Sequence, residues 1–361
     1  MYQIKYIFYI GDIISKDRIA YYDTLRFVAI LSIVAVHVFM IWRKGAQVFG
    51  FDIFAFSETV SFGVSIFLML SGALLLNREI ELSFFIRHRL SRIVYPFVFY
   101  VLLLFATGFA LSNPVSYNIF SHYWYFWLII GVYLSLPIIN KFIQHASIRE
   151  IEYFLVVFAV GSVFYQAVLL FNFEQYFDLN FFVAPLGFLV LGYYLSAKDF
   201  RLEPKKMVCL TALVFVGVTV VKILALGGVI PHDFVFDFNA TQSKILGSWL
   251  DVSIFRIVQV ASLFLFFRYL YELDKSRLKG FLEMGIVKGA ILSASRASYG
   301  IYLVELIFRR ALTPFFVGIP HSGTGICLTI VLMTAVIFGL SWATVLVFSR
   351  IPGLKRFSGY Y

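Results

Sequence analysis

Charged residues are scarce in this sequence of 361 residues. They make up 14% of the chain, against roughly 25% in a soluble globular domain. Hydrophobic residues reach 61% and include 43 Phe and 22 Tyr, more than a soluble core can cover without exposing apolar patches that aggregate. A bilayer solvates such side chains and accepts Tyr and Trp at its interfaces. The shortage of charge excludes a soluble protein and predicts an integral membrane protein in contact with the lipid bilayer.

Cysteine is also scarce, and Cys209 and Cys327 both lie in apolar runs. Two isolated cysteines form no disulfide framework and no zinc-type spacing, so we expect no metal. The motifs of soluble enzymes are missing too, with no Gly-x-Ser-x-Gly elbow, no Walker loop and no His-Glu-x-x-His. The net charge of +10 would suggest a nucleic-acid partner in a soluble protein. In a membrane protein we interpret the Lys and Arg as topology signals, and we expect no nucleic acid.

Long apolar runs are what the sequence does have. Ten of them approach the roughly 20 residues that cross a hydrocarbon core of about 30 Å. Because these runs lack the alternation of barrel strands, each is expected to be a helix that satisfies its own backbone. The predicted fold is an all-α integral membrane protein, a polytopic bundle of about ten transmembrane helices. The predicted spans are 24–42, 54–76, 94–111, 123–139, 151–170, 181–197, 207–229, 249–268, 298–319 and 326–349.

Lys and Arg gather in alternate connections between these runs. The positive-inside rule then places both termini in the cytoplasm, for a multi-pass protein of the cell (plasma or inner) membrane. No charge run, low-complexity tract or obvious repeat divides the chain. We predict an interfacial lead-in at 1–23, one ten-helix transmembrane domain at 24–349 and a short basic cytoplasmic tail at 350–361.

Arg26 and His37 are ionisable residues inside the first run. Their spacing of 11 residues puts them within about 20° of one helix face, about 16 Å apart along the axis. Arg26 lies close enough to the boundary to extend towards the headgroups, or it faces a polar interior. His37 is too deep for that, and it is either a buried structural residue or a functional one. A neutral imidazole there could take a proton from a hydroxyl and return it.

A cationic group precedes the third run, in Arg87, Arg89 and Arg92. Arg89 and Arg92 lie i, i+3 on a presumed helical turn, and we expect Pro96 to open the next span. Such a group binds lipid headgroups. Guanidinium groups also suit phosphate, such as the diphosphate and 3′-phosphate of a coenzyme A thioester, although the residue chemistry alone favours headgroups.

Polar residues at the mouth of the fourth run are His122 and Trp124. They belong either to an interfacial aromatic belt or to a pocket for an acceptor, since aromatic faces stack on sugar rings. In the second run, Ser71 beside Gly72 permits close approach of another helix. A contact of the Ser71 hydroxyl with substrate is the alternative.

Glu305 and Arg309 are spaced i, i+4 in the middle of the ninth run, with Arg310 beside them. The pair lowers the insertion cost of both members. The additional Arg would attract a carboxylate, a phosphate or a developing oxyanion. Further polar residues within spans, with no assigned role beyond a shared wet cavity, are Glu58, Lys222, Arg256 and Gln259.

Five stretches occur in this order along the chain: "LRFVAILSIVAVH", "FGVSIFLMLSGALLL", "RHRLSRIVYPF", "HYWYFWLIIGVYLSLP" and "SYGIYLVE". Together they resemble the membrane-bound acyltransferase 3 family. The first is similar to the Leu-Arg and His pattern of the family's first span, and the second to its second-span Ser-Gly signature. The third is similar to its Arg-x-x-Arg-x-x-x-Pro element, the fourth to its His-x-Trp-Tyr element and the fifth to its late Ser-Tyr-Gly-Ile-Tyr-Leu motif. Family members often end the late motif with His, where this chain has Glu305, which puts a second imidazole role in doubt.

The resemblance implies transfer of an acetyl or other short acyl group from acetyl-CoA, or another acyl-CoA, to a hydroxyl of a carbohydrate. The expected acceptor is a cell-envelope polysaccharide or a lipid-linked glycan, and the reaction is O-acetylation. His37 would be the base or a transient acyl carrier, Arg26 would orient it or bind donor phosphate, and Glu305 would stabilise charge. No tightly bound cofactor is implied. The donor site would use Arg87, Arg89 and Arg92, and the acceptor site His122, Trp124, Ser71 and Arg309.

Two alternatives remain open from the sequence. The same buried charges could line the path of an exporter of glycans or small molecules. The chain could also be a relative that keeps the bundle and has lost transfer activity. The oligomeric state is not predicted.

Overall fold

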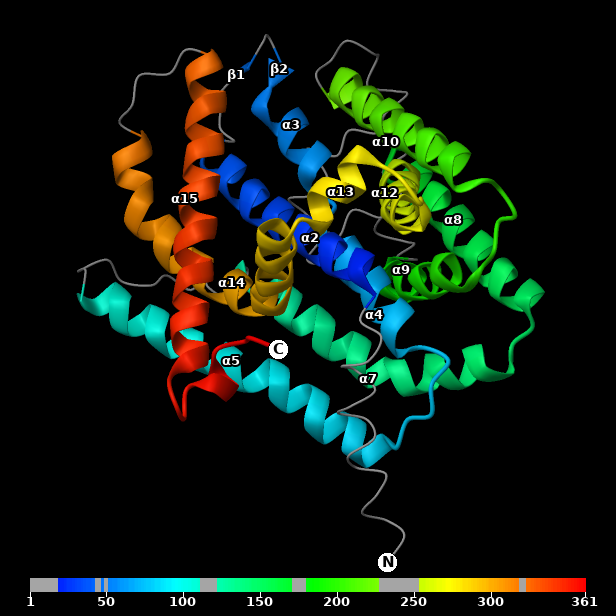
Figure 1. Ribbon diagram of the computed structural model, residues 1–361, viewed down its shortest axis with the longest axis horizontal. Helices are drawn as coiled ribbons and strands as arrows, with labels where there is room; N and C mark the ends of the chain where they lie inside the picture. The colour runs from blue at the N-terminus through cyan, green and yellow to red at the C-terminus, as the bar shows by residue number, and fades with distance from the viewer. Residues whose placement is uncertain are drawn as a thin grey trace, which may run out of the picture.

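Helices account for nearly all of the structure, a computed structural model (Figure 1). The residues that the structure describes are 19–42, 47–48, 51–110, 122–170, 180–226, 253–317 and 323–361. Most of the predicted lead-in, residues 1–18, lies outside them. The described helices are α2 (Ala20–Phe39), α3 (Ile53–Val60), α4 (Gly63–Leu75), α5 (Leu82–Ala110), α7 (Trp124–His145), α8 (Ile148–Leu170), α9 (Asn180–Ala197), α10 (Pro204–Leu226), α12 (Ile254–Glu272), α13 (Arg277–Glu283), α14 (Gly285–Val317) and α15 (Gly323–Arg350).

Short elements complete the described chain. A 3-10 turn, η1 (Met40–Trp42), continues α2, and another, η3 (Lys355–Phe357), follows α15. The strands β1 (Gln47–Val48) and β2 (Phe51–Asp52) form a two-residue antiparallel ladder before α3. These elements lie at the ends of helices and leave the bundle all-α.

Eight stretches of helix are long and apolar enough to cross a membrane within the described residues. They are Ala20–Trp42, Ala55–Leu75, Leu82–Gly108, Trp124–His145, Pro204–Leu224, Ile254–Glu272, Gly285–Phe316 and Gly323–Arg350. The two other predicted spans fall on α8 and α9. The prediction of an all-α, polytopic membrane protein is confirmed. The orientation of its termini stays a prediction.

Two predicted helix starts are wrong. Pro96 does not open a span but lies inside α5, which begins at Leu82. A transmembrane helix tolerates an internal proline because neighbouring groups replace the lost backbone bond. α14 likewise begins at Gly285 rather than at 298. Both helices are longer than the hydrocarbon core is thick. The 29 residues of α5, for example, extend about 43 Å. Each helix can therefore begin with polar turns outside the hydrocarbon core and continue through it without a break.

The pair α4 and α9 shows why small residues occur in these spans. A Cβ atom on Gly72 would lie 1.7 Å from the carbonyl oxygen of Leu189, and one on Gly192 would lie 2.0 Å from that of Met69. The two backbones therefore touch, as small residues allow in membrane helices. The Ser71 hydroxyl donates to the carbonyl of Phe67 in its own helix at 2.9 Å. This geometry supports the close-packing interpretation of Ser71 and Gly72.

A break at Ser61 and Phe62 separates α3 from α4 inside one span. It leaves carbonyl groups at the end of α3 without partners in their own helix. Arg256 donates to the Glu58 carbonyl at 2.9 Å, Lys222 donates to the same oxygen at 3.3 Å, and Gln259 donates to the Thr59 carbonyl at 2.9 Å. We call Glu58, Lys222, Arg256 and Gln259 the α3-end cluster.

The α3-end cluster is also linked through its side chains. Arg256 Nη1 donates to Gln259 Oε1 at 2.8 Å, and Arg256 Nη2 lies 3.4 Å from Glu58 Oε2. Arg256 and Gln259 are both fully buried. Since cations and donors at a helix C-terminus satisfy its carbonyls and oppose its dipole, the cluster accounts for how α3 can end within the membrane.

Candidate active site

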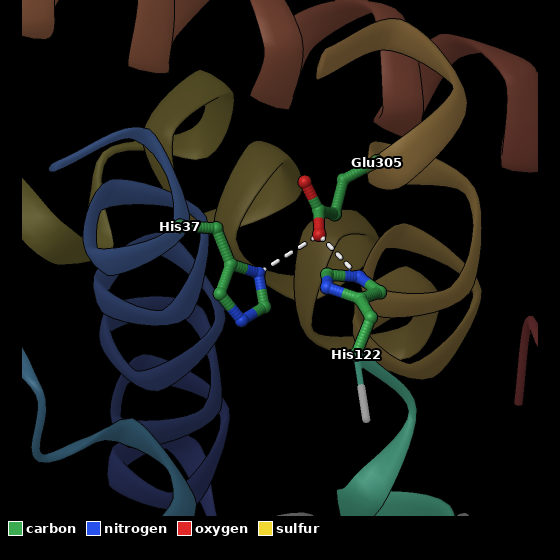
Figure 2. Close-up of side chains that lie close together, drawn as sticks. All are labelled: His37, His122 and Glu305. Atoms are coloured by element: carbon green, nitrogen blue, oxygen red, sulfur yellow. Dashed lines mark hydrogen bonds and ion pairs between the residues drawn. The ribbon is translucent and has the colours of Figure 1, made fainter. Parts of the chain in front are cut away.

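Three helical segments bring two imidazoles to one carboxylate (Figure 2). His37 lies in the last turn of α2, Glu305 lies in the middle of α14, and His122 lies just before α7. His37 Nδ1 is 2.8 Å from Glu305 Oε1, and His122 Nε2 is 2.9 Å from the same oxygen. The two rings are 4.7 Å apart between centroids. One carboxylate oxygen therefore joins two histidines.

Arg309 completes this group, one helical turn after Glu305. Its Nη1 donates to the His37 carbonyl at 3.2 Å, its Nη2 lies 3.1 Å from His122 Nδ1, and its Nε lies 3.6 Å from Glu305 Oε2. The first contact satisfies a carbonyl in the last turn of α2, which has no partner within the helix. We call His37, His122, Glu305 and Arg309 the His37 centre.

Burial makes these charges dependent on one another. Glu305 is fully buried and His37 is 8% exposed. An ionised carboxylate at this depth is costly unless it is paired, and Arg309 supplies the opposite charge. The predicted i, i+4 pair is therefore present, although its shortest contact is 3.6 Å. With both imidazoles neutral, the four side chains carry no net charge.

The guanidinium of Arg309 fixes the tautomer of His122. Arg has only donors, so His122 Nδ1 must accept its hydrogen bond and carry no proton. The ring proton then lies on Nε2, the atom that faces Glu305. A doubly protonated His122 would place a donor against a donor.

Glu305 fixes His37 in the complementary way. An ionised carboxylate only accepts, so Nδ1 of His37 donates its proton to Oε1. In the neutral ring, Nε2 then keeps a lone pair. A carboxylate behind an imidazole orients the ring and stabilises the imidazolium that forms when the ring takes a proton. The Nε2 atom of a neutral His37 oriented in this way can accept a proton.

Two tyrosines hold the segment before α7 against α14. The Tyr123 hydroxyl donates to the Leu303 carbonyl at 2.8 Å, and the Tyr302 hydroxyl donates to the His122 carbonyl at 3.3 Å. Tyr123 is fully buried and Tyr302 is 4% exposed. His122 is therefore positioned through its backbone as well as through its ring.

His37, His122 and Glu305 also offer three metal-ligating atoms within 4.8 Å of one another. A metal would need a lone pair on His122 Nε2. The contact from Arg309 places the proton there instead, and its positive charge disfavours a divalent cation. These residues therefore fit a proton-transfer centre better than a metal site.

Arg26 lies at the other end of α2, about 16 Å from His37 along the helix axis. That distance exceeds the reach of its side chain. Its guanidinium is 3.5 Å from Asp23, and Asp23 also accepts a hydrogen bond from Ser295 at 2.7 Å. The structure thus keeps Arg26 apart from His37 and next to the first part of α14.

The remaining predicted residues lie outside the His37 centre. Arg87, Arg89 and Arg92 lie in the first turns of α5, where Arg87 and Arg92 are exposed and Arg89 is partly buried. Trp124 begins α7, two residues after His122, and Ser71 lies at the contact of α4 and α9. The structure joins the first motif, the His-x-Trp element and the late motif. The arginines of α5 are not part of this group, although the Ile93 carbonyl, next to Arg92, accepts a hydrogen bond from Tyr299 of α14 at 2.9 Å.

His122 is the residue whose surroundings the sequence describes least well. Its motif marks it as a polar residue at a helix end, compatible with an acceptor pocket. Its contact with Glu305 depends on how α7 and α14 pack, and no short-range pattern encodes that. The sequence did contain one chemical signal. A Glu buried in a span needs hydrogen-bond donors, and only a few donor side chains lie within the predicted spans.

A multi-pass helical membrane protein with a buried His–Glu–His group is the class that this architecture defines. A family model for an acyltransferase domain matches residues 19–346, and the chain belongs to that family. No curated protein and no solved structure matches the chain. The match contains all four residues of the His37 centre, and the protein is accordingly a membrane acyltransferase.

Proposed function

We propose that this acyltransferase moves an acetyl or other short acyl group from acyl-CoA to a hydroxyl of a cell-envelope or lipid-linked glycan. The observation that carries the proposal is the contact of His37 Nδ1 with Glu305 Oε1 at 2.8 Å inside the bundle. This contact supports a role for His37 as a base within the membrane, because an imidazole buried only for packing would not need a carboxylate partner. The cell membrane is the proposed location, with both termini in the cytoplasm.

The proposed reaction starts with the lone pair on His37 Nε2. This nitrogen takes the proton of the acceptor hydroxyl while the hydroxyl oxygen attacks the thioester carbonyl carbon. The carbon–sulfur bond then breaks, and the thiolate of coenzyme A takes the proton back from the imidazolium. The products are an O-acyl ester and free coenzyme A, and atoms and charge balance. The same nitrogen is the one that would carry the acyl group if transfer took two steps.

The other members of the His37 centre support this proton transfer. Glu305 stabilises the imidazolium through Oε1, as a carboxylate partner does in other acyl-transfer centres. Its second oxygen, Oε2, is buried and lies 3.6 Å from Arg309 Nε, so these two groups form an ion pair without a hydrogen bond between those atoms. His122 and Arg309 hold the carboxylate in place.

The donor is proposed to enter at the other end of α2, on the side of Arg26 and the arginines of α5. Arg87, Arg89 and Arg92 would bind the phosphates of coenzyme A, because guanidinium groups pair with phosphate through two hydrogen bonds. Arg26 would bind donor phosphate rather than orient His37, since its distance from His37 rules out direct contact. His122, Trp124 and Arg309 would face the acceptor, while Ser71 is the weakest candidate.

The test is release of free coenzyme A thiol by purified protein offered acetyl-CoA and envelope glycans. His37→Ala should abolish release, because no other imidazole of the centre has a free lone pair, while the protein stays folded in the membrane. His145→Ala is the matched control, since His145 is an exposed imidazole at the end of α7. Retained turnover in His37→Ala would remove His37 from the mechanism. A wild-type protein that moves glycan across a membrane without releasing thiol would be an exporter instead.

A further inference from the structure

Residues 355–361 fold back onto the bundle after α15 (Figure 1). We call them the docked segment. Tyr100 of α5 is fully buried and donates to the Ser358 carbonyl at 3.0 Å. The backbone nitrogen of Tyr361 donates to the Arg296 carbonyl of α14 at 2.9 Å. The docked segment is thus hydrogen-bonded to α5 and to α14, although the sequence suggested only a short basic tail.

Glycines at two positions make this contact possible. A Cβ atom on Gly300 would lie 2.3 Å from the Ser358 carbonyl oxygen, and one on Gly359 would lie 2.7 Å from the Gly300 nitrogen. Gly359 has φ +72°, a backbone conformation that residues other than glycine rarely adopt. Gly300 is the glycine of "SYGIYLVE", five residues before Glu305. This glycine therefore makes room for the docked segment.

Tyr361 rests directly on Arg92. Its hydroxyl donates to the Arg92 carbonyl at 2.5 Å, and the Arg92 guanidinium carbon lies 5.6 Å from the centre of its ring. A cation over an aromatic face is attracted to it, so the ring restricts the rotamers of Arg92. An arginine held in one orientation loses less conformational entropy when it binds an anion.

The docked segment also adds cations to the same surface. The Arg356 guanidinium carbon lies 5.4 Å from the centre of the Tyr95 ring, and Tyr95 is three residues after Arg92 on α5. Lys355, Arg356 and Arg92 are all exposed. Two chain segments that are far apart in sequence therefore present positive groups side by side.

We propose that the docked segment forms part of a phosphate-binding surface for the acyl donor, with Arg356 and Lys355 as contact residues and Tyr361 as a positioning residue for Arg92. This proposal rests on the proposed function, because it assigns the phosphates to a coenzyme A thioester. Anionic lipid headgroups offer the same phosphate chemistry, and the experiment separates the two sources.

The experiment measures acetyl-CoA kinetics and coenzyme A binding in nanodiscs of phosphatidylcholine alone. Arg356→Ala should raise KM for acetyl-CoA about tenfold with kcat nearly unchanged, since it removes one charged hydrogen-bond donor to phosphate. If Arg356 contacts the 3′-phosphate, Arg356→Ala should raise KM less for an acyl donor that lacks this phosphate. Tyr361→Ala should raise KM more than Tyr361→Phe, which keeps the ring over Arg92. Lys205→Ala is the control, because it removes an exposed positive charge at the start of α10.

The outcomes separate this proposal from the proposed function. Wild-type protein that binds no coenzyme A overturns both. Wild-type protein that binds it, with KM unchanged in Arg356→Ala and Tyr361→Ala, overturns the role of the docked segment and leaves the acyltransferase reaction intact. If the variants change KM only in nanodiscs that contain phosphatidylglycerol, the surface binds lipid headgroups, and the proposed role of the docked segment in donor binding is overturned. If Tyr361→Ala lowers the melting temperature, Arg356→Ala decides the question, because Arg356 is exposed.

Discussion

Two groups of buried polar residues lie within the bundle, and they differ in what their side chains contact. In the α3-end cluster, Arg256, Lys222 and Gln259 donate to backbone carbonyls at the end of α3. In the His37 centre, imidazole, carboxylate and guanidinium contact one another, and one ring nitrogen of His37 keeps a lone pair. Buried charge alone therefore does not mark a catalytic site in a membrane protein. The partners of the charge distinguish support of a helix end from the proton transfer proposed for the His37 centre.

The largest expected effect separates the two groups by activity. Glu305→Gln should lower kcat about 10³-fold, because an amide neither fixes the His37 tautomer nor stabilises its imidazolium. The melting temperature should also fall, because Arg309 loses its partner charge, so kcat is expressed per folded molecule. Thiol release and thermal unfolding in detergent are the two measurements. Glu58→Gln is the matched control in the α3-end cluster, and it should lower the melting temperature while kcat per folded molecule stays near wild type. The reverse pattern would contradict the distinction.

Arg256→Ala should have the next largest effect, on stability. It removes the donors to the Glu58 carbonyl and to Gln259 in a fully buried position, which costs about 3 kcal/mol. Thermal unfolding and the yield of monodisperse protein measure it. Arg256→Lys keeps the charge and should recover part of the loss. If Arg256→Ala instead keeps its stability and loses turnover, the α3-end cluster belongs to the site.

His122→Phe should lower kcat by about 10²-fold, within the range of a lost acid–base partner. Phenylalanine keeps the ring but offers neither a proton to Glu305 nor an acceptor to Arg309. Steady-state kinetics against both substrates check this, with KM for the donor unchanged. Tyr123→Phe is a milder control, since it removes only the hydrogen bond to the Leu303 carbonyl. A rise in acceptor KM with kcat unchanged would leave His122 as an acceptor contact only and would remove its role in holding Glu305.

The smallest effects are expected where α4 meets α9. Ser71→Ala should leave both kcat and melting temperature close to wild type, because the hydroxyl donates only within its own helix. Gly72→Ala, its neighbour, should destabilise the protein by about 1–3 kcal/mol, since the new methyl group meets the Leu189 backbone. Thermal unfolding of the two variants makes the comparison. A large loss of activity in Ser71→Ala would show that its hydroxyl contacts substrate.

Local patterns predicted much of the fold. Within the described residues the predicted spans are helical, with the second divided between α3 and α4, because hydrophobic length in lipid leaves no other backbone structure. The starts of α5 and α14 were missed, since a helix can continue past the hydrocarbon edge where its side chains are already polar. Short spacing also predicted the proximity of Glu305 and Arg309, which lie one turn apart. Arg26 and His37 share a face by the same rule, but the rise of the helix separates them.

The sequence by itself determined that this protein is a helical membrane protein, where its spans lie, and that His37 and Glu305 are costly residues in need of partners. The length of a hydrophobic run and the cost of burying a charge are properties of a single helix, so the sequence of one segment is enough to predict them. Only the tertiary structure decided that these two residues are partners, together with His122, and that residues 355–361 return to Arg92. Those contacts join positions up to 269 residues apart. They depend on which helices pack together, and in a bilayer close packing and interhelical hydrogen bonds decide that rather than hydrophobicity.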